Sequence, residues 1–369
     1  MLCAMLDLLI LTAGYGEGHN AAARGLLTAA EQLGYRAEIA DSFTALGSYY
    51  DRSRRQYIEM INRVPRLWAF IYGWVDRVPA VEFNLPMLAD VVEDLNRVLT
   101  EKQPRVVVSV YPLYSYFLQR LFPRSRPFGF HTVITDSITI NRVWHRAPSD
   151  SYIVPNEETA VVLREHGLPE KAIHTLGFPV NPCFATNRPE RPDIAKGIRV
   201  LFMINAGKKT APAIVSRLLQ IKDIHLTVTV GRDEALRKNI ETAAAGRQVD
   251  ILGWIQNMPE LLMTHHVLIG KAGGAAVQET IAARTPMIIT QVVPGQEEGN
   301  ARLLFESGCG ALCSTPEVIA HKIEELFADQ GRVWTEWHDK ISKISRPDAA
   351  LREVEWLMAT AADRAIAAG

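Results

Sequence analysis

The stretch LDLLILTAGYGEGH, residues 6–19, decides the fold class of this 369-residue chain. An apolar run with the length of a buried strand leads directly into a loop that carries glycine at positions 14, 16 and 18. A helical pattern follows from residue 20 to residue 33 and ends at Gly34. A strand, a glycine loop and a helix in this order are typical of α/β proteins with a parallel sheet. Because the run contains Asp7 and has no basic start, we predict a first strand and not a signal peptide.

The same order returns in the second half of the chain, where RVLFMINAGKK, residues 199–209, leads a strand pattern into a second glycine turn. Short apolar runs alternate with helical patterns elsewhere, and the further strands that they predict are 37–40, 106–110, 131–135, 151–154, 225–230, 249–252, 267–269 and 287–292. Between residues 179 and 192 four prolines interrupt this periodicity, as in a linker.

These patterns predict an α/β protein with two Rossmann-like domains that face a central cleft. The predicted parts are an N-terminal domain 1–178, a linker 179–197, a C-terminal domain 198–345, and a final helix 346–369 that packs back on the N-terminal domain.

The composition is that of a globular protein, with 48% hydrophobic and 22% charged residues. A formal net charge of -1 gives no reason to expect a nucleic-acid partner. No window holds eighteen apolar residues without a charge, which argues against a membrane-spanning helix. The four cysteines have no Cys-x-x-Cys spacing, and Cys309 and Cys313 have no second pair of metal ligands beside them. We therefore expect reduced cysteines, no metal site and a cytoplasmic protein.

Two neighbouring motifs in the second half indicate a nucleotide-sugar site: KAGGAAVQE, residues 271–279, and PGQEEGN, residues 294–300. A glycine pair lets backbone amides approach a diphosphate closely, and Glu279 can accept hydrogen bonds from two ribose hydroxyls. Gln296 and Asn300 are four residues apart, one helical turn, so both amides can face the same ligand. A surface helix without a ligand is the alternative for this pair.

His19 stands inside the first glycine loop, at the head of the helix. The unperturbed imidazole pKa of about 6.5 suits the removal of a proton from a hydroxyl. Asp136 follows the strand 131–135, at a carboxyl end where ligands bind, and either orients His19 or replaces it as the base. In simpler alternatives, His19 caps the helix and Asp136 caps a turn. A dinucleotide site is a further alternative, with Glu38 or Asp41 on the ribose, although His19 takes the place of the third glycine of that motif.

Four parts of the chain together resemble the diacylglycerol glycosyltransferases: residues 14–23, the pair Thr135-Asp136, residues 177–180 and residues 271–300. This family includes the processive glucosyltransferase of Gram-positive bacteria and the plant monogalactosyldiacylglycerol synthases. The lipid-linked N-acetylglucosaminyltransferase of peptidoglycan synthesis is a more distant relative. The resemblance extends from about residue 6 to residue 325. It implies the GT-B fold, a UDP-sugar donor held mainly by the C-terminal domain, and inversion at the anomeric carbon without a metal or any other cofactor.

The resemblance also implies roles for individual residues. His19 falls on the family's glycine-loop histidine, a base or acceptor-site residue, and Glu279 falls on its ribose-binding glutamate. Uracil is expected against the backbone of residues 253–258. The full set expected to bind the donor is Gly16, Gly18, Gly207, Lys208, Gly231, Arg232, Ile255, Asn257, Met258, Lys271, Gly273, Gly274, Glu279, Gln296 and Asn300.

The chain departs from the family at two places. The loop 205–209 has fewer glycines and carries Lys208 and Lys209, which either stabilise the departing UDP or are ordinary solvated lysines. His265 and His266 stand where relatives tend to have an acidic residue, and we expect them to pack or cap rather than to bind a metal.

Residues 49–77 hold seven aromatic residues and six arginines against three acids. Interleaved arginines and aromatic rings suit the surface of an anionic membrane, and the family's lipid-facing region falls here. The alternative is a helical pair whose aromatic residues are core. We expect a lipid acceptor and peripheral attachment to the inner face of the cell membrane.

These observations together predict an inverting, metal-independent glycosyltransferase that moves a hexose from a UDP-sugar to a lipid hydroxyl, above all that of diacylglycerol. Transfer to another lipid or to a soluble acceptor is one alternative. A non-hydrolysing UDP-sugar epimerase and a non-catalytic nucleotide-binding module are the others.

Overall fold

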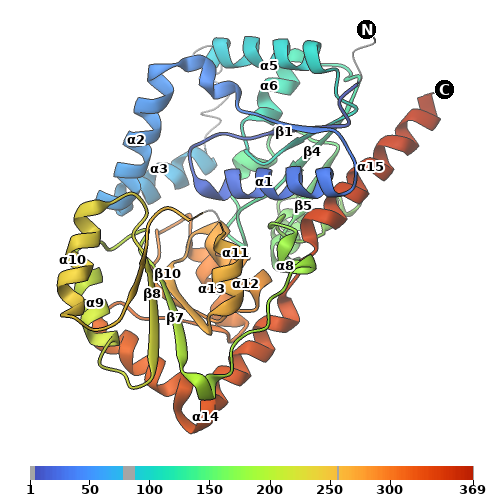
Figure 1. Cartoon of the computed structure of the whole chain (residues 1–369). Helices are drawn as coiled ribbons and strands as arrows, with labels where there is room; N and C mark the ends of the chain where they lie inside the picture. The colour runs from blue at the N-terminus through green and yellow to red at the C-terminus, as the bar shows by residue number, and fades with distance from the viewer. Residues whose placement is uncertain (1–4, 78–87, 256, 369) are drawn as a thin grey trace. The chain divides into compact units, whose positions relative to one another are not determined.

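The computed structural model describes residues 5–77, 88–255 and 257–368, except for the side chains of residues 62, 65, 66 and 363–368. The chain forms two compact units (Figure 1). The first contains the residues up to Pro182, the segment Val293–Gly299 and the residues from Asp348 onward, and the second contains Cys183–Val292 and Asn300–Pro347. The domain boundaries drawn from the sequence at 178, 197 and 345 stay predictions.

The first unit is built on a parallel sheet with the strand order β2-β1-β3-β4-β5-β6. These strands are β1 (Leu8–Leu11), β2 (Ala37–Ala40), β3 (Val106–Ser109), β4 (Gly129–Val133), β5 (Ser151–Val154) and β6 (Ile173–Thr175). The α-helices are α1 (Glu17–Gln32), α2 (Ser48–Arg63), α3 (Pro65–Arg77), α5 (Ala89–Lys102), α6 (Tyr114–Leu121), α7 (Glu157–Glu165) and α15 (Ala349–Ala368). Short 3₁₀ helices are η1 (Ser42–Leu46), η3 (Arg142–Trp144) and η4 (Glu170–Ala172).

The strands of the first sheet are apolar because helices cover both faces of the sheet. All residues of β1 are fully buried. Leu9 and Leu11 belong to one core with Val91 and Leu95 of α5, and Figure 1 shows α1 on the opposite side of β1. The last helix, α15, packs on α1, which confirms that the C-terminal helix returns to the N-terminal unit.

The second unit has a parallel sheet with the order β12-β11-β10-β7-β8-β9. Its strands are β7 (Ile198–Met203), β8 (Ile224–Thr229), β9 (Asp250–Leu252), β10 (Val267–Lys271), β11 (Met287–Gln291) and β12 (Gly310–Leu312). Its helices are α8 (Cys183–Thr186), η5 (Ile194–Lys196), α9 (Ala211–Leu218), α10 (Glu234–Ala244), α11 (Met258–Thr264), α12 (Gly274–Ala283), α13 (Glu298–Glu306, of which the first two residues belong to the first unit) and α14 (Pro316–Ile344), which kinks at residues 328–331.

These two parallel sheets with flanking helices confirm the predicted α/β class. Every strand predicted from an apolar run is present, with ends that differ by at most two residues. The two strands that the sequence analysis missed are β6 and β12. Both contain three residues and stand at an edge of their sheet, so neither has the continuous apolar run of a fully buried strand.

The proline-rich stretch predicted as a linker is anchored to the second unit by two arginines. Arg188 donates to the carbonyl oxygens of Ala282 and Ala283, and Arg191 donates to those of Ala283 and Arg284. Because the last carbonyls of a helix have no intrahelical partner, these cations stabilise the C-terminal end of α12. The segment therefore holds in place the helix that carries the predicted ribose-binding glutamate.

No helix in the described part of the chain is long and apolar enough to cross a membrane.

Candidate functional site

His19 lies in the first turn of α1, partly buried, with its ring fixed by the neighbouring strands. Its Nδ1 is 2.8 Å from the carbonyl oxygen of Val110 and 3.0 Å from Oγ1 of Thr135. A carbonyl oxygen only accepts, so Nδ1 carries the proton and Nε2 keeps its lone pair. Burial lowers the pKa of His19 to about 4, and the hydrogen bond to Val110 partly offsets this effect. The imidazole is therefore neutral at pH 7.

Asp136 follows β4 and is held by an indole. Its Oδ2 accepts a hydrogen bond from Nε1 of Trp144 at 2.9 Å, and the Trp144 ring lies 5.9 Å from the His19 ring. Burial raises the pKa of Asp136 to about 6, against the opposing effect of the Trp144 bond. The orienting contacts of His19 come from Val110 and Thr135. Of the two roles that the sequence left open for Asp136, the orientation of His19 is thus filled by other residues.

The first glycine loop and the two acids expected at a dinucleotide site form contacts within the protein. The amide of Gly14 donates to Oδ2 of Asp41 at 3.1 Å and also bonds to the hydroxyl of Tyr50. Asp41 also accepts from the amide of Phe43, and Glu38 forms an ion pair with Lys102 at 2.6 Å. Both acids proposed for the ribose of a dinucleotide therefore have structural partners. Gly16 precedes α1 and Gly18 lies in its first turn, and their contact with a ligand stays a prediction.

Gln296 is held by aromatic side chains of α2 and α3, all within the first unit. Its Oε1 accepts from Nε1 of Trp68 at 3.0 Å, and its Nε2 donates to the hydroxyl of Tyr57 at 3.1 Å. Since an indole N–H can only donate, the Trp68 contact fixes which end of the amide is the oxygen. The sequence analysis placed Tyr57 and Trp68 in the lipid-facing segment and missed this contact.

The segment around Gln296 is a turn. The prediction that Gln296 and Asn300 share one face of a helix is therefore wrong, because Gln296 lies outside the helix. Residues 294–297 form turns, and α13 begins at Glu298. Asn300 lies inside α13 and belongs to the second unit, whereas Gln296 belongs to the first. Nδ2 of Asn300 donates to the carbonyl oxygen of Ala272 at 3.3 Å, and its Oδ1 is buried without a hydrogen-bond partner among the described residues.

The other predicted donor residues follow strands of the second sheet. Gly207 and Lys208 follow β7, Gly231 and Arg232 follow β8, and Ile255, Asn257 and Met258 follow β9, while Lys271 ends β10 directly before Gly273 and Gly274. Because the carboxyl ends of adjacent parallel strands meet at one edge of a sheet, these residues come together there. This edge is where open α/β sheets bind ligands.

The glycine pair starts α12 at that edge. Gly273 is the N-cap residue, Gly274 is the first helical residue, and Glu279 lies in the same helix, partly buried. Free amides at a helix N-terminus attract anions, and the helix dipole adds to the attraction. Beside it, Lys271 ends β10 where the register with β11 shifts. The arrangement can bind a diphosphate at the amides and a hydroxylated ring at Glu279.

Polar contacts within the second unit already occupy several of these side chains. Nζ of Lys208 forms an ion pair with Oδ2 of Asp233 at 2.7 Å, so its charge is compensated. The guanidinium of Arg232 lies 4.9 Å from the ring of Trp254. The side-chain amide of Asn257 bonds to Glu260. Ile255 and Met258 flank this residue, and their contacts to uracil stay predictions.

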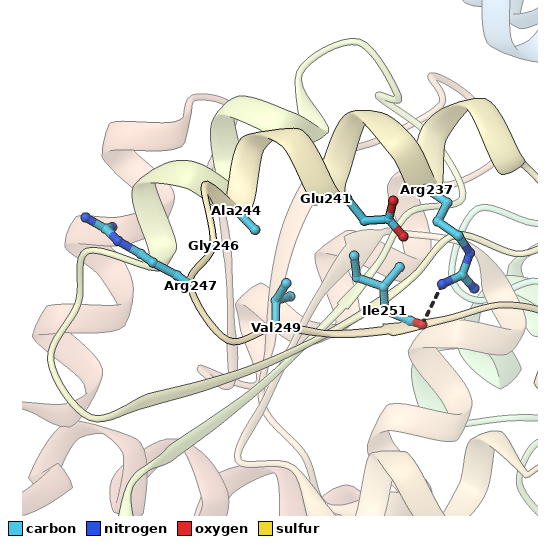
Figure 2. A pocket seen from close by; sticks show the side chains of 7 residues that line it. All are labelled: Arg237, Glu241, Ala244, Gly246, Arg247, Val249 and Ile251. Atoms are coloured by element: carbon cyan, nitrogen blue, oxygen red, sulfur yellow. Dashed lines mark hydrogen bonds between the residues drawn. The ribbon is translucent and has the colours of Figure 1, made fainter.

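A surface cavity of about 380 Å³ lies beside β9. Its lining comes from α10 and the segment that follows it: Arg237, Glu241, Ala244, Gly246, Arg247, Val249 and Ile251. Figure 2 shows that Arg237 bonds to the carbonyl oxygen of Ile251, at 3.0 Å. This bond supports the strand that leads into the loop 253–258, and the cavity itself contains no residue predicted for the site.

His265 and His266 are structural, as the sequence analysis expected. His265 bonds to the carbonyl oxygen of Leu261 and to Oγ1 of Thr227, and His266 bonds to the amide of Arg199 and to the carbonyl oxygen of Pro192. Within residues 5–77, 88–255 and 257–368, no group of three or more His, Cys, Asp and Glu side chains has the arrangement of a metal site.

The basic and aromatic segment forms α2 and α3, and only part of it is exposed. Leu67, Phe70 and Trp74 of α3 are 52%, 72% and 49% exposed. Tyr50 and Ile61 of α2 are buried, and Nε of Arg54 donates to the carbonyl oxygen of Gly14. The side chain of Arg66 lies outside the described residues. Some of the aromatic residues are therefore core and others form a surface stripe.

Two family models match the chain. Residues 19–180 match the monogalactosyldiacylglycerol (MGDG) synthase model, and residues 208–338 match the glycosyltransferase family 28 C-terminal domain. Similar curated proteins include monogalactosyldiacylglycerol synthase 3 of Arabidopsis thaliana, 25% identical over 92% of this chain and 78% of that protein. The processive diacylglycerol beta-glucosyltransferase of Bacillus subtilis is 24% identical, over 87% of each chain.

Solved structures share the fold at low sequence identity. MurG of Acinetobacter baumannii has a TM-score of 0.62 at 15% identity, with 95% of this chain and 99% of that chain covered. The UDP-GlcNAc 2-epimerase of Neisseria meningitidis has a TM-score of 0.60 at 12% identity, with 96% and 99% covered. The likeness to MurG confirms the predicted GT-B architecture.

Proposed function

We propose that this glycosyltransferase, which matches the monogalactosyldiacylglycerol synthase model over residues 19–180 and the family 28 C-terminal domain over residues 208–338, transfers a hexose from a UDP-sugar to a lipid hydroxyl, above all that of diacylglycerol. The observation that carries the lipid acceptor is the family match over residues 19–180, the part that contains His19 and Asp136. The plant relative is named as a synthase of monogalactosyldiacylglycerol, and the bacterial relative is named as a glucosyltransferase of diacylglycerol.

In this proposal the donor binds at the start of α12. The amides of Gly273 and Gly274 receive the diphosphate, and Glu279 accepts hydrogen bonds from the ribose hydroxyls. The buried Oδ1 of Asn300 can accept a hydrogen bond from a donor hydroxyl, since no described residue satisfies it. The loop 253–258 receives the uracil. UDP-sugar is a substrate in this proposal, and no cofactor is needed.

The reaction is a single displacement with inversion. The acceptor hydroxyl oxygen forms a bond to the anomeric carbon while the bond from that carbon to the UDP oxygen breaks, and a base takes the hydroxyl proton. We assign Asp136 as the base, because a pKa of about 6 leaves it mainly ionised at pH 7 and still basic. The neutral His19, with a pKa of about 4, accepts a hydrogen bond at Nε2 and orients the hydroxyl.

The departing UDP carries the negative charge that develops. Since Lys208 is already paired with Asp233, the N-terminus of α12 and its glycine amides stabilise most of this charge. No metal takes part in this proposal.

The stripe of Leu67, Phe70 and Trp74 is the proposed contact with a membrane. Exposed apolar side chains along one helix face insert into the headgroup region, and Arg52 and Arg55 on the neighbouring helix are exposed to meet anionic lipids. We propose peripheral attachment to the inner face of the cell membrane. Serine at all three stripe positions should abolish sedimentation with anionic liposomes, and Leu312→Ser, an equally exposed position in the second unit, should not; equal sedimentation of both variants would refute this surface.

The function is tested by incubating the protein with diacylglycerol liposomes and either UDP-glucose or UDP-galactose, and by measuring released UDP and glycolipid product. Stoichiometric UDP and glycolipid are expected with one of the donors. Conversion of the donor to an epimer without UDP release would instead identify an isomerase.

The donor site is tested by Glu279→Gln, with Glu241→Gln as the matched control from the cavity in Figure 2. Loss of the negative charge and of one acceptor oxygen should weaken UDP binding roughly 10-fold or more in calorimetry, and the control should bind UDP like the wild type. Equal affinities for UDP in all three proteins would rule out the ribose contact.

A further inference from the structure

The helix α3 has two apolar faces that point in opposite directions. Residues of a helix follow each other at about 100°, so Leu67, Phe70 and Trp74 share one face. Trp68 and Tyr72 lie on the other side of the helix axis. The first face is exposed, and the second packs on the segment 293–299. The aromatic residues at 68 and 72 therefore have a different task from the stripe.

Two glycines allow the segment 293–299 to lie against α3 and residues 137–139, which belong to the same unit. A Cβ at Gly295 would stand 3.5 Å from Cδ1 of Tyr72, and the residue has a φ of +80°. A Cβ at Gly299 would stand only 1.8 Å from the carbonyl oxygen of Ser137, whereas the Gly299 amide donates to Oγ1 of Thr139. A larger residue at 299 is incompatible with this packing, whereas at 295 it is the positive φ that disfavours any other residue.

The turn of residues 293–297 is closed by hydrogen bonds between its first and last residues. The carboxylate of Glu297 is buried and accepts from the amide of Val293 at 2.9 Å, and the Glu297 amide donates to the Val293 carbonyl oxygen at the same distance. The backbone on both sides of Gln296 is thus fixed, and only its side-chain torsions remain to be set.

The hydroxyl of Tyr57 and the indole of Trp68 fix the side-chain torsions of Gln296. Trp68 binds Oε1 of Gln296, and Tyr57 lies within 3.2 Å of Oε1 and 3.1 Å of Nε2. The rings of Tyr57 and Trp68 are themselves in edge contact, with centroids 5.0 Å apart. With these contacts made, one N–H of the amide has no partner among the described residues and is available to a ligand.

We propose that Tyr57 and Trp68 are positioning residues that hold the Gln296 amide in the orientation that binds the hexose of the donor. This inference rests on the proposed function, because it assigns Gln296 to the donor's sugar. Neither residue touches the substrate in this view, and their effect passes through Gln296 alone. Tyr57 and Trp68 therefore affect the binding of the hexose and not the binding of UDP alone.

The test compares Tyr57→Phe and Trp68→Phe, which remove the hydrogen-bonding atoms and keep the rings. Each should raise the KM for the UDP-hexose roughly 3- to 10-fold, the loss of one hydrogen bond, with UDP affinity in calorimetry unchanged. The matched control is Tyr49→Phe on α2, an exposed tyrosine outside the stripe, which should leave the donor KM unchanged.

A double-mutant cycle with Gln296→Ala separates positioning from a general structural effect. If both residues act only through Gln296, adding Tyr57→Phe to Gln296→Ala changes the donor KM less than about twofold. Additive effects in the double variant would overturn the proposal, as would an unchanged donor KM in both single variants. Thermal unfolding identifies a variant that fails to fold. If one of the two single variants fails to fold, the donor KM of the other variant tests the proposal.

The two failures are distinguishable. A wild-type protein that neither releases UDP from a UDP-hexose nor binds UDP refutes the proposed function. A wild-type protein that transfers normally while Tyr57→Phe and Trp68→Phe match it in donor KM refutes only the positioning of Gln296. Liposome sedimentation should be unchanged in both variants, and its loss would assign these rings to lipid binding instead.

Discussion

The pH dependence of transfer tests which group removes the acceptor proton. The perturbation is a shift from pH 7.5 to pH 5. Asp136, with a pKa of about 6, is almost fully ionised at pH 7.5 and only about 10% ionised at pH 5. His19, with a pKa of about 4, keeps about 90% of its neutral form at pH 5. The two candidate bases therefore predict losses that differ about tenfold.

With Asp136 as the base, kcat/KM for the acceptor should fall roughly 10-fold between these pH values, along a single limb centred near pH 6. The assay follows UDP release at saturating donor, and calorimetric UDP affinity at both pH values shows whether donor binding contributes to the change. Asp136→Asn should lose at least about 100-fold in kcat and have no limb near pH 6.

A profile that stays flat down to pH 5 in the wild type would refute the assignment of Asp136 and leave His19 as the base. The reasoning from burial would also fail if Asp136→Asn retained the acidic limb, since the limb would then belong to another group. His19→Gln should reduce kcat without moving the limb, because the neutral ring orients the hydroxyl and does not titrate in this range.

Three further predictions concern stability. Asp136→Asn should raise the unfolding free energy at pH 7.5 by about 3 kcal/mol and have little effect below pH 4, because the raised pKa of this carboxyl means that stability is lost as pH rises from 4 through 6. Glu353→Met should raise the thermal midpoint more at pH 8 than at pH 5, since burial raises the pKa of Glu353 and neither carboxyl oxygen has a partner among the described residues; a gain that is equal at both pH values would contradict this. Gly299→Ala should cost about 1–3 kcal/mol because its Cβ would overlap the Ser137 carbonyl, and a thermal midpoint equal to that of the wild type would show that the segment 293–299 does not lie there.

Much of the fold could be predicted because parallel strands buried on both faces have continuous apolar sequences. The strands at 37–40 and 151–154 have the predicted bounds. That the residues expected to bind the donor lie close together could be predicted for a related reason, since each glycine comes shortly after a strand and the carboxyl ends of parallel strands lie on the same side of a sheet. Their binding of the donor stays a prediction. The short edge strand at 173–175 had no such signal, because two of its three residues are only partly buried.

The environments of the two candidate bases, His19 and Asp136, could not be predicted. The proton of His19 is fixed by the backbone carbonyl of Val110, 91 residues away, and a carbonyl has no sequence signature. Trp144 had no motif that tied it to Asp136. The aromatic residues Tyr57 and Trp68 were noticed as a composition, but their hydrogen bonds to Gln296 span 239 and 228 residues and depend on the side of the helix that each occupies.

The path of the backbone between the two units has a consequence for biosynthesis. It passes from one unit to the other after residues 182, 292, 299 and 347, so the first sheet receives its last covering helix, α15, from the opposite end of the chain. When only the first 182 residues have emerged from the ribosome, the first sheet can form, but α1 does not yet have α15 packed on it. Folding during synthesis must therefore leave the earliest part unfinished until the latest part emerges, and a gene cut between the units would encode two incomplete halves.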